Sequence, residues 1–319
     1  MIKIKKLNNF LKKKKRFFKY ALVSLCLSVL VGTSFFDIVL RGYIFSKKIK
    51  EFPLGLSISS YPILKSPIDP DITAKAVVVM DSDSKVLLFT KNPNLSFSMA
   101  STTKIMTALV ALEYYKMDDI LTIKTEKVEG VNVGFSEGEK LSFENILYAM
   151  LLPSGNDAAL AVAQNYPGGE VAFVKKMNEK AKSLHLVNTN YADAIGLDDN
   201  KDYTTPLDLT YLSSAALQNK IFASIVATKT KEITDITGEN KYVLNNLNKL
   251  LGVSGVNGVK TGYTTEAGQV LVTSKVEVDS LNKAHTLIIV VMDSLDRFWD
   301  TSKILYLLSE NINYLSTRP

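Results

Sequence analysis

Residues 99–110 read Met-Ala-Ser-Thr-Thr-Lys-Ile-Met-Thr-Ala-Leu-Val, which puts a hydroxyl and an amine at the start of an apolar, helix-like run. Ser101 and Lys104 stand three positions apart, so on a helix their side chains share a face. A serine becomes a strong nucleophile when a base takes its proton, and a lysine can be that base if burial or a second cation keeps it neutral. The first helical turn also presents unpaired backbone N–H groups that suit an oxyanion. Because Ser-x-x-Lys arises by chance in many helices, it needs support from the rest of the chain.

Two later motifs supply that support. Ser154-Gly155-Asn156 puts a hydroxyl and a carboxamide on a predicted turn before another helix. Lys260-Thr261-Gly262 lies in a strand-like segment. The order Ser-x-x-Lys, Ser-x-Asn, Lys-Thr-Gly is the motif set of penicillin-binding proteins and class A β-lactamases.

The segments around the motifs extend the match. The chain resembles the serine D-alanyl-D-alanine carboxypeptidases, the low-molecular-mass penicillin-binding proteins of peptidase family S11, and the segments that carry the resemblance are 100–107, 151–159, 188–197 and 258–268. The resemblance implies an α+β fold of the penicillin-binding-protein and β-lactamase-like transpeptidase type. In that fold a mainly antiparallel sheet packs with helices and a helical subdomain, and the active site lies between them.

The apolar periodicity of the chain also predicts an α+β arrangement. A β-hairpin is expected from 75–80 and 85–90, around the turn Asp81-Ser82-Asp83-Ser84. Helices are expected at 101–115, 142–152, 156–166, 170–184, 206–217 and 221–227. Strands are expected at 230–236, 242–244, 256–261, 269–274 and 286–292, followed by a closing helix at 297–315.

The resemblance implies a role for each of the four catalytic candidates. Ser101 attacks the carbonyl carbon of the penultimate D-alanine, and Lys104 receives its proton. Ser154 relays a proton to the leaving amine. Asn156 orients Lys104 and the substrate amide.

The Lys-Thr-Gly strand supplies the substrate-binding candidates. By resemblance, Lys260 adds a positive potential that disfavours a second charge on Lys104 and, with Thr261, holds the terminal carboxylate of the substrate. Gly262 has no side chain, so an extended peptide can lie along the strand edge. The backbone N–H groups of Ser101 and Tyr263 form the oxyanion hole. No metal and no organic cofactor is needed for this chemistry.

The implied substrate is a peptidoglycan stem peptide that ends in D-Ala-D-Ala, and the implied inhibitors are β-lactams. Three alternatives stay open, namely a D,D-endopeptidase acting on cross-links, a β-lactamase and a non-catalytic penicillin-binding sensor. Class A β-lactamases deacylate with a glutamate in a Glu-x-x-Leu-Asn setting. Neither Glu170 nor Glu179 stands in that setting, which favours the peptidase.

Charge is unevenly distributed along the chain. The formal net charge is +6, but residues 1–50 contain 13 Lys and Arg against one Asp, whereas the rest contains 25 basic and 31 acidic residues. The mildly acidic remainder gives no electrostatic support for a nucleic-acid partner.

The basic N-terminus precedes an apolar run. Nine Lys or Arg lie between Lys3 and Lys19, and the uncharged run 20–36 follows. This order is typical of export segments, and the positive-inside rule keeps the N-terminus in the cytoplasm. We expect an uncleaved single-pass anchor in the lipid bilayer, with the domain on the extracytoplasmic side of the cell membrane. The alternative is a signal peptide cleaved near Gly32 or Ser34, which would release a secreted protein.

We therefore expect three parts in the chain: a basic segment with an anchor or signal at 1–50, a Pro- and Ser-containing spacer at 51–71, and a catalytic domain at 72–319. The one cysteine, Cys26, falls in the apolar run, so the exported domain has no disulfide. Asp81 and Asp83 fit turn chemistry better than metal binding. His185 and His285 stand in no metal-ligand spacing, and we expect them at the surface and in strand packing.

Overall fold

The computed structural model describes residues 19, 60–125, 127–197, 201–280 and 282–315. The chain divides into two compact units, Met1–Ser57 and Ile58–Pro319, and the second is called the folded domain below. The predicted anchor at 20–36 lies outside the described residues. Among the helices that are described, none has the length and apolar character to span a bilayer.

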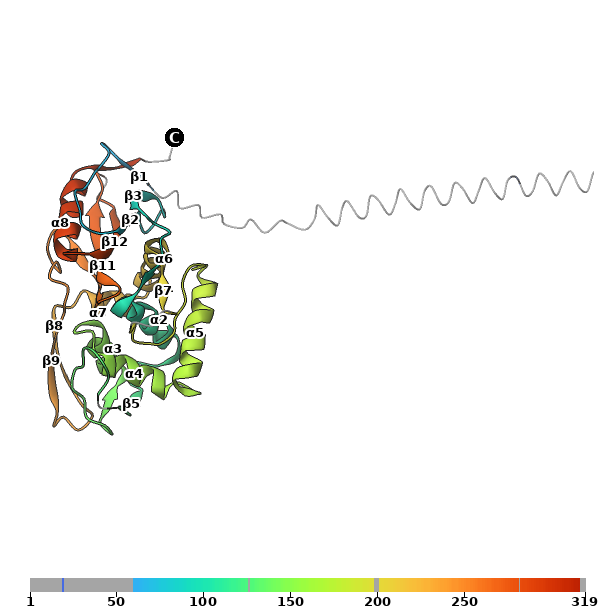
Figure 1. Cartoon of the computed structure of the whole chain (residues 1–319), viewed down its shortest axis with the longest axis vertical. Coiled ribbons are helices and arrows are strands. Elements are labelled where there is room, and N and C mark those ends of the chain that lie inside the picture. The colour runs from blue at the N-terminus through green and yellow to red at the C-terminus, as the bar shows by residue number, and fades with distance from the viewer. Residues whose placement is uncertain (1–18, 20–59, 126, 198–200, 281, 316–319) are drawn as a thin grey trace, which may run out of the picture. The chain divides into compact units, whose positions relative to one another are not determined.

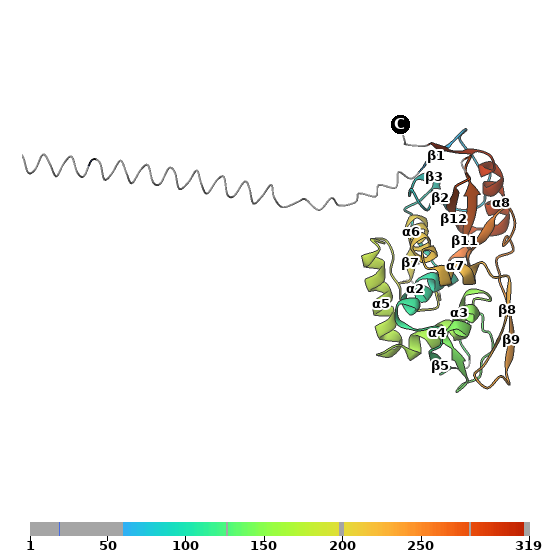
Figure 2. The same ribbon diagram turned by 180° about the vertical axis from the view of Figure 1, so that it is seen from behind.

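A five-stranded antiparallel sheet forms the frame of the folded domain (Figures 1 and 2). Its spatial order is β10 (Val256–Thr264), β11 (Gly268–Val278), β12 (Ala284–Ser294), β2 (Ala76–Asp81) and β3 (Leu87–Lys91). The β2–β3 hairpin and the strands predicted at 256–261, 269–274 and 286–292 are confirmed, with extended ends. β10 stands at one edge of this sheet, which leaves it next to the helical part.

Both faces of the sheet are covered, because alternate residues of a strand point to opposite sides. Val78 and Met80 of β2 belong to the larger core, together with the helices that follow Ser101. Val77 and Val79 belong to a smaller core with α8 (Arg297–Leu308). Burial on both faces explains why β2 is apolar at consecutive positions rather than alternating ones.

Helices make up most of the chain between β3 and β8, in the lower part of Figure 1. A 3-10 turn, η1 (Ala100–Thr103), leads directly into α2 (Lys104–Tyr114), and all six predicted helices are confirmed. The others are α3 (Phe143–Leu151), α4 (Asn156–Asn165), α5 (Gly169–Ser183), α6 (Pro206–Leu217) and α7 (Lys220–Val226). Side-chain caps define where several begin: the Ser142 hydroxyl accepts from the N–H of Asn145, and Thr205 accepts from that of Asp208.

Four two-stranded ribbons complete the fold of the described residues. The strands predicted at 230–236 and 242–244 pair with each other, as β8 (Thr230–Thr234) and β9 (Lys241–Asn245), and do not join the main sheet. The remaining pairs are β4 (Phe97–Ser98) with β7 (Tyr203–Thr204), β5 (Ile120–Thr122) with β6 (Lys140–Ser142), and β1 (Tyr61–Leu64) with β13 (Ile312–Leu315).

The predicted closing helix at 297–315 is wrong in its last third. α8 ends at Leu308, Glu310 has a positive φ of 58°, and the chain continues as β13. β13 pairs with β1, which lies inside the range predicted as spacer, and Asn311 and Ser66 exchange hydrogen bonds beside the pair. Pairing with a strand some 250 positions away in the sequence cannot be read from local periodicity.

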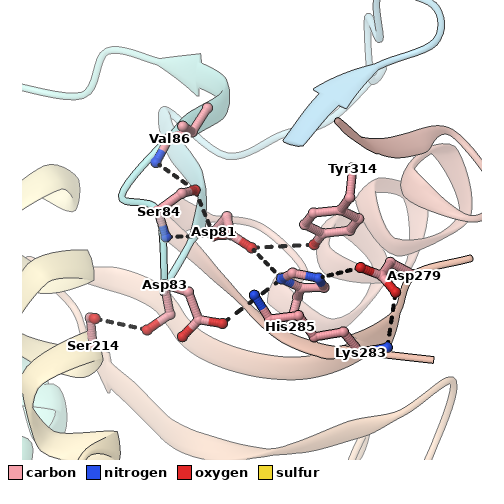
Figure 3. A network of polar contacts seen from close by, with 10 residues as sticks. Asp81, Asp83, Ser84, Val86, Ser214, Asp279, Lys283, His285 and Tyr314 are labelled. Atoms are coloured by element: carbon pink, nitrogen blue, oxygen red, sulfur yellow. Dashed lines mark hydrogen bonds and ion pairs between the residues drawn. The ribbon is translucent and has the colours of Figure 1, made fainter. Parts of the chain in front are cut away.

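A polar network surrounds His285 at the end of β12, and we call it the His285 cluster: His285, Asp279, Asp81, Asp83 and Tyr314 (Figure 3). The ring of His285 is buried, with Nε2 at 3.0 Å from Oδ2 of Asp279 and Nδ1 at 3.9 Å from Oδ2 of both Asp81 and Asp83. Tyr314 stacks on this ring, 3.7 Å between centroids, and donates to Oδ2 of Asp81 at 3.2 Å.

Asp81 stabilises the turn between β2 and β3, and the two histidines differ in burial. Oδ1 of Asp81 accepts from the backbone N–H and the hydroxyl of Ser84, as turn chemistry predicts. His285 packs inside a strand and His185 is exposed after α5. In the described part of the chain, no group of three or more His, Cys, Asp and Glu side chains could hold a metal ion.

Candidate active site

Ser101 and Lys104 lie where η1 becomes α2. Ala100 opens the turn with a φ of 48°, and the carbonyl of Met99 accepts from both the N–H and the hydroxyl of Thr102. This tight turn directs the Ser101 hydroxyl towards the Lys104 amine, with Oγ at 3.0 Å from Nζ. The candidate nucleophile and its candidate base are therefore within hydrogen-bond reach, as the i, i+3 spacing predicts.

The amine of Lys104 is fully buried and makes three hydrogen bonds. Besides Ser101, it donates to Oδ1 of Asn156 at 2.7 Å and to the backbone carbonyl of Ile195 at 2.7 Å. Three acceptors match the three protons of an ammonium group. The sequence predicted the first two partners but not the third, because a backbone carbonyl has no signature in a sequence.

Burial lowers the pKa of Lys104 from its ordinary value to about 7. The carboxylates of Asp193, Asp157 and Asp202 act in the opposite direction and keep that pKa from falling further. A base with a pKa near neutrality is well suited to accept a proton from a serine and return it to a leaving group. The main cause of the lowered pKa of Lys104 is burial, and not the positive charge of Lys260 that the motifs suggested.

The Ser154-Gly155-Asn156 turn approaches from the start of α4. Ser154 is buried with a φ of 68°, and its Oγ has no hydrogen-bond partner among the described residues. Asn156 is the first residue of α4, and its amide nitrogen donates to the carbonyl of Glu129 at 2.5 Å. The amide is thus held in the orientation that points its oxygen at Lys104.

Asp157 fastens the same turn from the other side. Its carboxylate is buried and accepts from the backbone N–H groups of Val133 at 3.1 Å and Gly134 at 2.9 Å. The backbone N–H of Asn156 donates to the carbonyl of Val131 at 2.7 Å. Segment 129–135 therefore forms a wall behind Asn156, and the sequence gives no motif for it.

The Lys-Thr-Gly motif lies on the edge strand β10, which packs against η1. Lys260 and Thr261 are both buried, and Nζ of Lys260 donates to the carbonyl of Thr261 at 3.0 Å. A Cβ on Gly262 would lie 3.1 Å from Cβ of Ala100 and 3.3 Å from the backbone nitrogen of Ser101. Glycine is needed here because the strand touches the turn that carries Ser101. Tyr263 follows with a side chain 64% exposed.

Basic side chains gather around β10. The pKa of Lys260 is well below its usual range, first because of burial and then because of the charges of Lys104 and Arg297. Nη1 of Arg297 donates to the carbonyl of Gly262 at 2.6 Å. Arg297 was not among the predicted site residues. Its one sequence signal is its place at the first residue of α8, where the helix dipole disfavours a cation.

The structure thus joins Ser101, Lys104 and Asn156 by direct contacts, and brings Gly262 against the turn that carries Ser101. Lys260 lies close enough to Lys104 for their charges to interact. Ser154 stands on the same turn as Asn156, and Tyr263 on the same edge strand as Lys260.

Similarity to known proteins follows the same residues. The D-alanyl-D-alanine carboxypeptidase family model matches residues 64–295. A D-alanyl-D-alanine endopeptidase of Pseudomonas aeruginosa is 34% identical over 224 residues, which cover 68% of this chain and 72% of that protein. The carboxypeptidase DacF of Bacillus subtilis is 34% identical over 209 residues, and the match covers 63% of this chain and 54% of DacF. The chain therefore spans about half the length of DacF.

A solved structure agrees with these matches. The crystal structure of the Streptomyces K15 DD-transpeptidase superposes with a TM-score of 0.70 at 32% identity, covering 76% of this chain and 98% of that one. The antiparallel sheet with helices on both faces is thus a transpeptidase-like α+β fold, as the motifs implied. With a matching family model over most of its folded domain, relatives at one-third identity and this shared fold, the chain belongs to the D-alanyl-D-alanine carboxypeptidases of peptidase family S11.

Proposed function

We propose that this protein is a serine-type D-Ala-D-Ala carboxypeptidase that removes the terminal D-alanine of peptidoglycan stem pentapeptides. The observation that carries the proposal is the buried Lys104 amine, 3.0 Å from the Ser101 hydroxyl and with a pKa of about 7. Family membership supplies the substrate class.

In the first step, Oγ of Ser101 attacks the carbonyl carbon of the penultimate D-alanine, and its proton passes to Nζ of Lys104. The backbone N–H groups of Ser101 and Tyr263 stabilise the oxyanion. The C–N bond then breaks, and the amine of the terminal D-alanine leaves with a proton that Lys104 returns through Ser154. Water attacks the acyl-enzyme, and the same groups return the proton to Ser101.

Two basic side chains beside β10, Lys260 and Arg297, suit a substrate that ends in a carboxylate. Lys260 and Thr261 contact that carboxylate in our proposal, and Arg297 adds positive potential beside them. In the free protein burial disfavours the charged form of Lys260. An incoming carboxylate favours that charged form again, so binding of the substrate restores the cation where it is needed.

Covalent labelling tests the nucleophile. Labelled penicillin should attach to Ser101, Ser101→Ala should abolish the attachment, and the wild type should release D-alanine from diacyl-Lys-D-Ala-D-Ala. Labelling without release of D-alanine would show a sensor instead of an enzyme. Because neither Glu170 nor Glu179 has the β-lactamase setting, the penicilloyl-enzyme should be long-lived. Nitrocefin hydrolysis at about ten per second or faster would identify a β-lactamase, since that is an ordinary enzyme rate.

A D,D-endopeptidase activity on cross-links is the second candidate. It is favoured by two relatives named D-alanyl-D-alanine endopeptidase, from Pseudomonas aeruginosa and Escherichia coli, at 34% and 31% identity. Parallel assays on a pentapeptide and on a D-Ala-cross-linked dimer decide between them. Faster cleavage of the dimer would replace the carboxypeptidase assignment.

We also propose that the run 20–36 anchors the protein in the cell membrane, with the folded domain and the residues that lead to it outside the cytoplasm. The basic residues before an apolar run support this orientation. The protein should then fractionate with membranes and resist extraction by salt, which removes attachments that are only electrostatic. A soluble exported protein that begins near Phe35 would show a cleaved signal peptide and leave the chemistry at Ser101 unaffected.

A further inference from the structure

We infer that Asp193 is a positioning residue for the reaction, because it holds the carbonyl of Ile195 against the amine of Lys104. The inference rests on the proposed function and adds a residue that none of the sequence motifs contains. Asp193 lies in the loop after α5, two positions before Ile195. It makes no hydrogen bond to Lys104 in the described structure and acts through the loop.

The carboxylate of Asp193 organises the loop by accepting successive backbone N–H groups. Oδ1 accepts from Ile195 at 2.7 Å and from Gly196 at 2.6 Å, and Oδ2 lies 3.4 Å from the nitrogen of Leu197. With these N–H groups turned towards Asp193, the carbonyl of Ile195 faces Lys104. The hydroxyl of Thr107 in α2 also donates to the carbonyl of Ala194 at 2.7 Å. Two side chains therefore fasten the loop next to the Lys104 amine.

Gly196 shows how closely this loop approaches the nucleophile's turn. Its φ is 83°, and a Cβ there would lie 1.9 Å from the carbonyl oxygen of Ala100 and 2.7 Å from the hydroxyl of Thr103. Only a residue without a side chain fits such an approach. Any shift of the loop that Asp193 fastens must therefore disturb both η1 and the third hydrogen bond of Lys104.

The charge of Asp193 adds an effect on the protonation of Lys104. Among the carboxylates that raise the pKa of Lys104 against the effect of burial, Asp193 is the largest contributor, followed by Asp157 of α4 and Asp202 before β7. Lys260 of β10 is the basic group that faces Lys104, and Glu170 of α5 interacts with Asp193 itself. Asp193 thus sets both the position of an acceptor and the pH at which the amine becomes a base.

The substitution Asp193→Asn separates these two effects. Asp193→Asn keeps an oxygen that can accept from the N–H groups of Ile195 and Gly196 but removes the charge. The neutral amine is the active form, so a lower pKa of Lys104 moves the acidic limb of the acylation rate to lower pH. We expect a shift of about 0.5–1 unit, below the effect of a carboxylate in direct contact. The rate at pH 9 should stay within about threefold of the wild type.

The full chain is tested with labelled penicillin from pH 5 to 9. Asp193→Ala loses both effects and should be slower at every pH, by about tenfold or more. Asp235→Asn is the matched control, because this carboxylate also accepts from a turn, between β8 and β9. That control should leave the acidic limb in place.

Two outcomes overturn the inference. If Asp193→Asn and Asp193→Ala lose the same acylation rate and the acidic limb does not move, Asp193 has only a structural role. If both variants acylate at the wild-type rate, the loop keeps its position without Asp193. An NMR titration of carbon-13-labelled lysine in the wild type and Asp193→Asn reads the pKa of Lys104 without turnover. It therefore tests the inference even if Ser101 takes up no penicillin, a result that would defeat only the proposed function.

Discussion

Lys104 and His285 are both buried nitrogen bases with carboxylates nearby, but their immediate neighbours differ. The three groups that accept from Lys104 are all neutral oxygens, and the nearby carboxylates of Asp193 and Asp157 make no hydrogen bond to the amine. Around His285 the carboxylates themselves are the neighbours, with Asp279 at 3.0 Å and Asp81 at 3.9 Å (Figure 3).

We expect this difference to separate a site that moves protons from one that holds strands together. A neutral acceptor tolerates the loss of a proton from the amine, because no buried opposite charge is left without compensation. A carboxylate that is hydrogen-bonded to an imidazole instead fixes the orientation of the ring. The elements differ as well, since Lys104 is surrounded by turns with positive φ at Ala100, Ser154 and Gly196, whereas His285 extends from a regular strand.

The largest effect is expected when the side chain at position 104 can no longer lose a proton. Lys104→Arg keeps the charge and the donors, but a guanidinium does not deprotonate in proteins. We expect penicillin acylation to fall by about 10³-fold or more, the size of a lost general base. Stopped-flow acylation measures it, with Lys75→Arg at a surface ion pair as the control. A loss below tenfold would place the base elsewhere.

The converse change removes the base from the His285 cluster. His285→Leu loses the hydrogen bond to Asp279 and puts an apolar side chain among carboxylates, so the free energy of unfolding should fall by about 1–3 kcal/mol. Acylation of Ser101 should not change. Denaturant unfolding and acylation of the same samples provide both values, and His285→Gln, which retains a donor, should recover part of the loss. A loss of acylation in His285→Leu would contradict the prediction that the His285 cluster affects stability alone.

The pH dependence sharpens the comparison at Lys104. Because the neutral amine is the active form and its pKa is about 7, acylation should fall about tenfold for each pH unit below 7 and level off above it. The measurement is the acylation rate from pH 5 to 9 at constant ionic strength. A rate that stays flat down to pH 5 would contradict the lowered pKa of Lys104.

The smallest expected effect concerns Tyr314. Tyr314→Phe keeps the stacked ring on His285 but removes the donor to Asp81, so the free energy of unfolding should fall by about 0.5–1.5 kcal/mol. Thermal unfolding at pH 7 measures it, and acylation should again be unaffected. If Tyr314→Phe lowers the free energy of unfolding as much as His285→Leu does, the hydroxyl of Tyr314 stabilises the His285 cluster more than the imidazole does.

The sequence was most informative where chemistry depends on side chains close together in the chain. Ser101 with Lys104, and Ser154 with Asn156, follow from spacing and from the turn or helix that spacing predicts. The carbonyl of Ile195 could not be predicted, since any residue type supplies one. Arg297 reaches Gly262 only through the folding of β10 and α8 together, and no local pattern connects them.

The fold shows the same limit. Strands that are buried on both faces, such as β2 and β12, can be predicted from their consecutive apolar residues. The segment of β13 was predicted as helix because Ile312 and Leu315 also fit a helical spacing. Its pairing with β1, with Leu315 opposite Tyr61, makes it a strand.

The pairing of β1 with β13 has a consequence for engineering the chain. Tyr61 stands opposite Leu315, so the first and last described strands of the folded domain run side by side, and residues paired in this way have their Cα atoms about 4.5–5.5 Å apart. A short linker between these strands would make the domain continuous in a circle, and new ends could be opened in the turn at Gly238 between β8 and β9. Such a circular permutant should keep the contacts of Ser101 and Lys104 intact, because neither the linker nor the new ends fall in a segment that contacts Lys104.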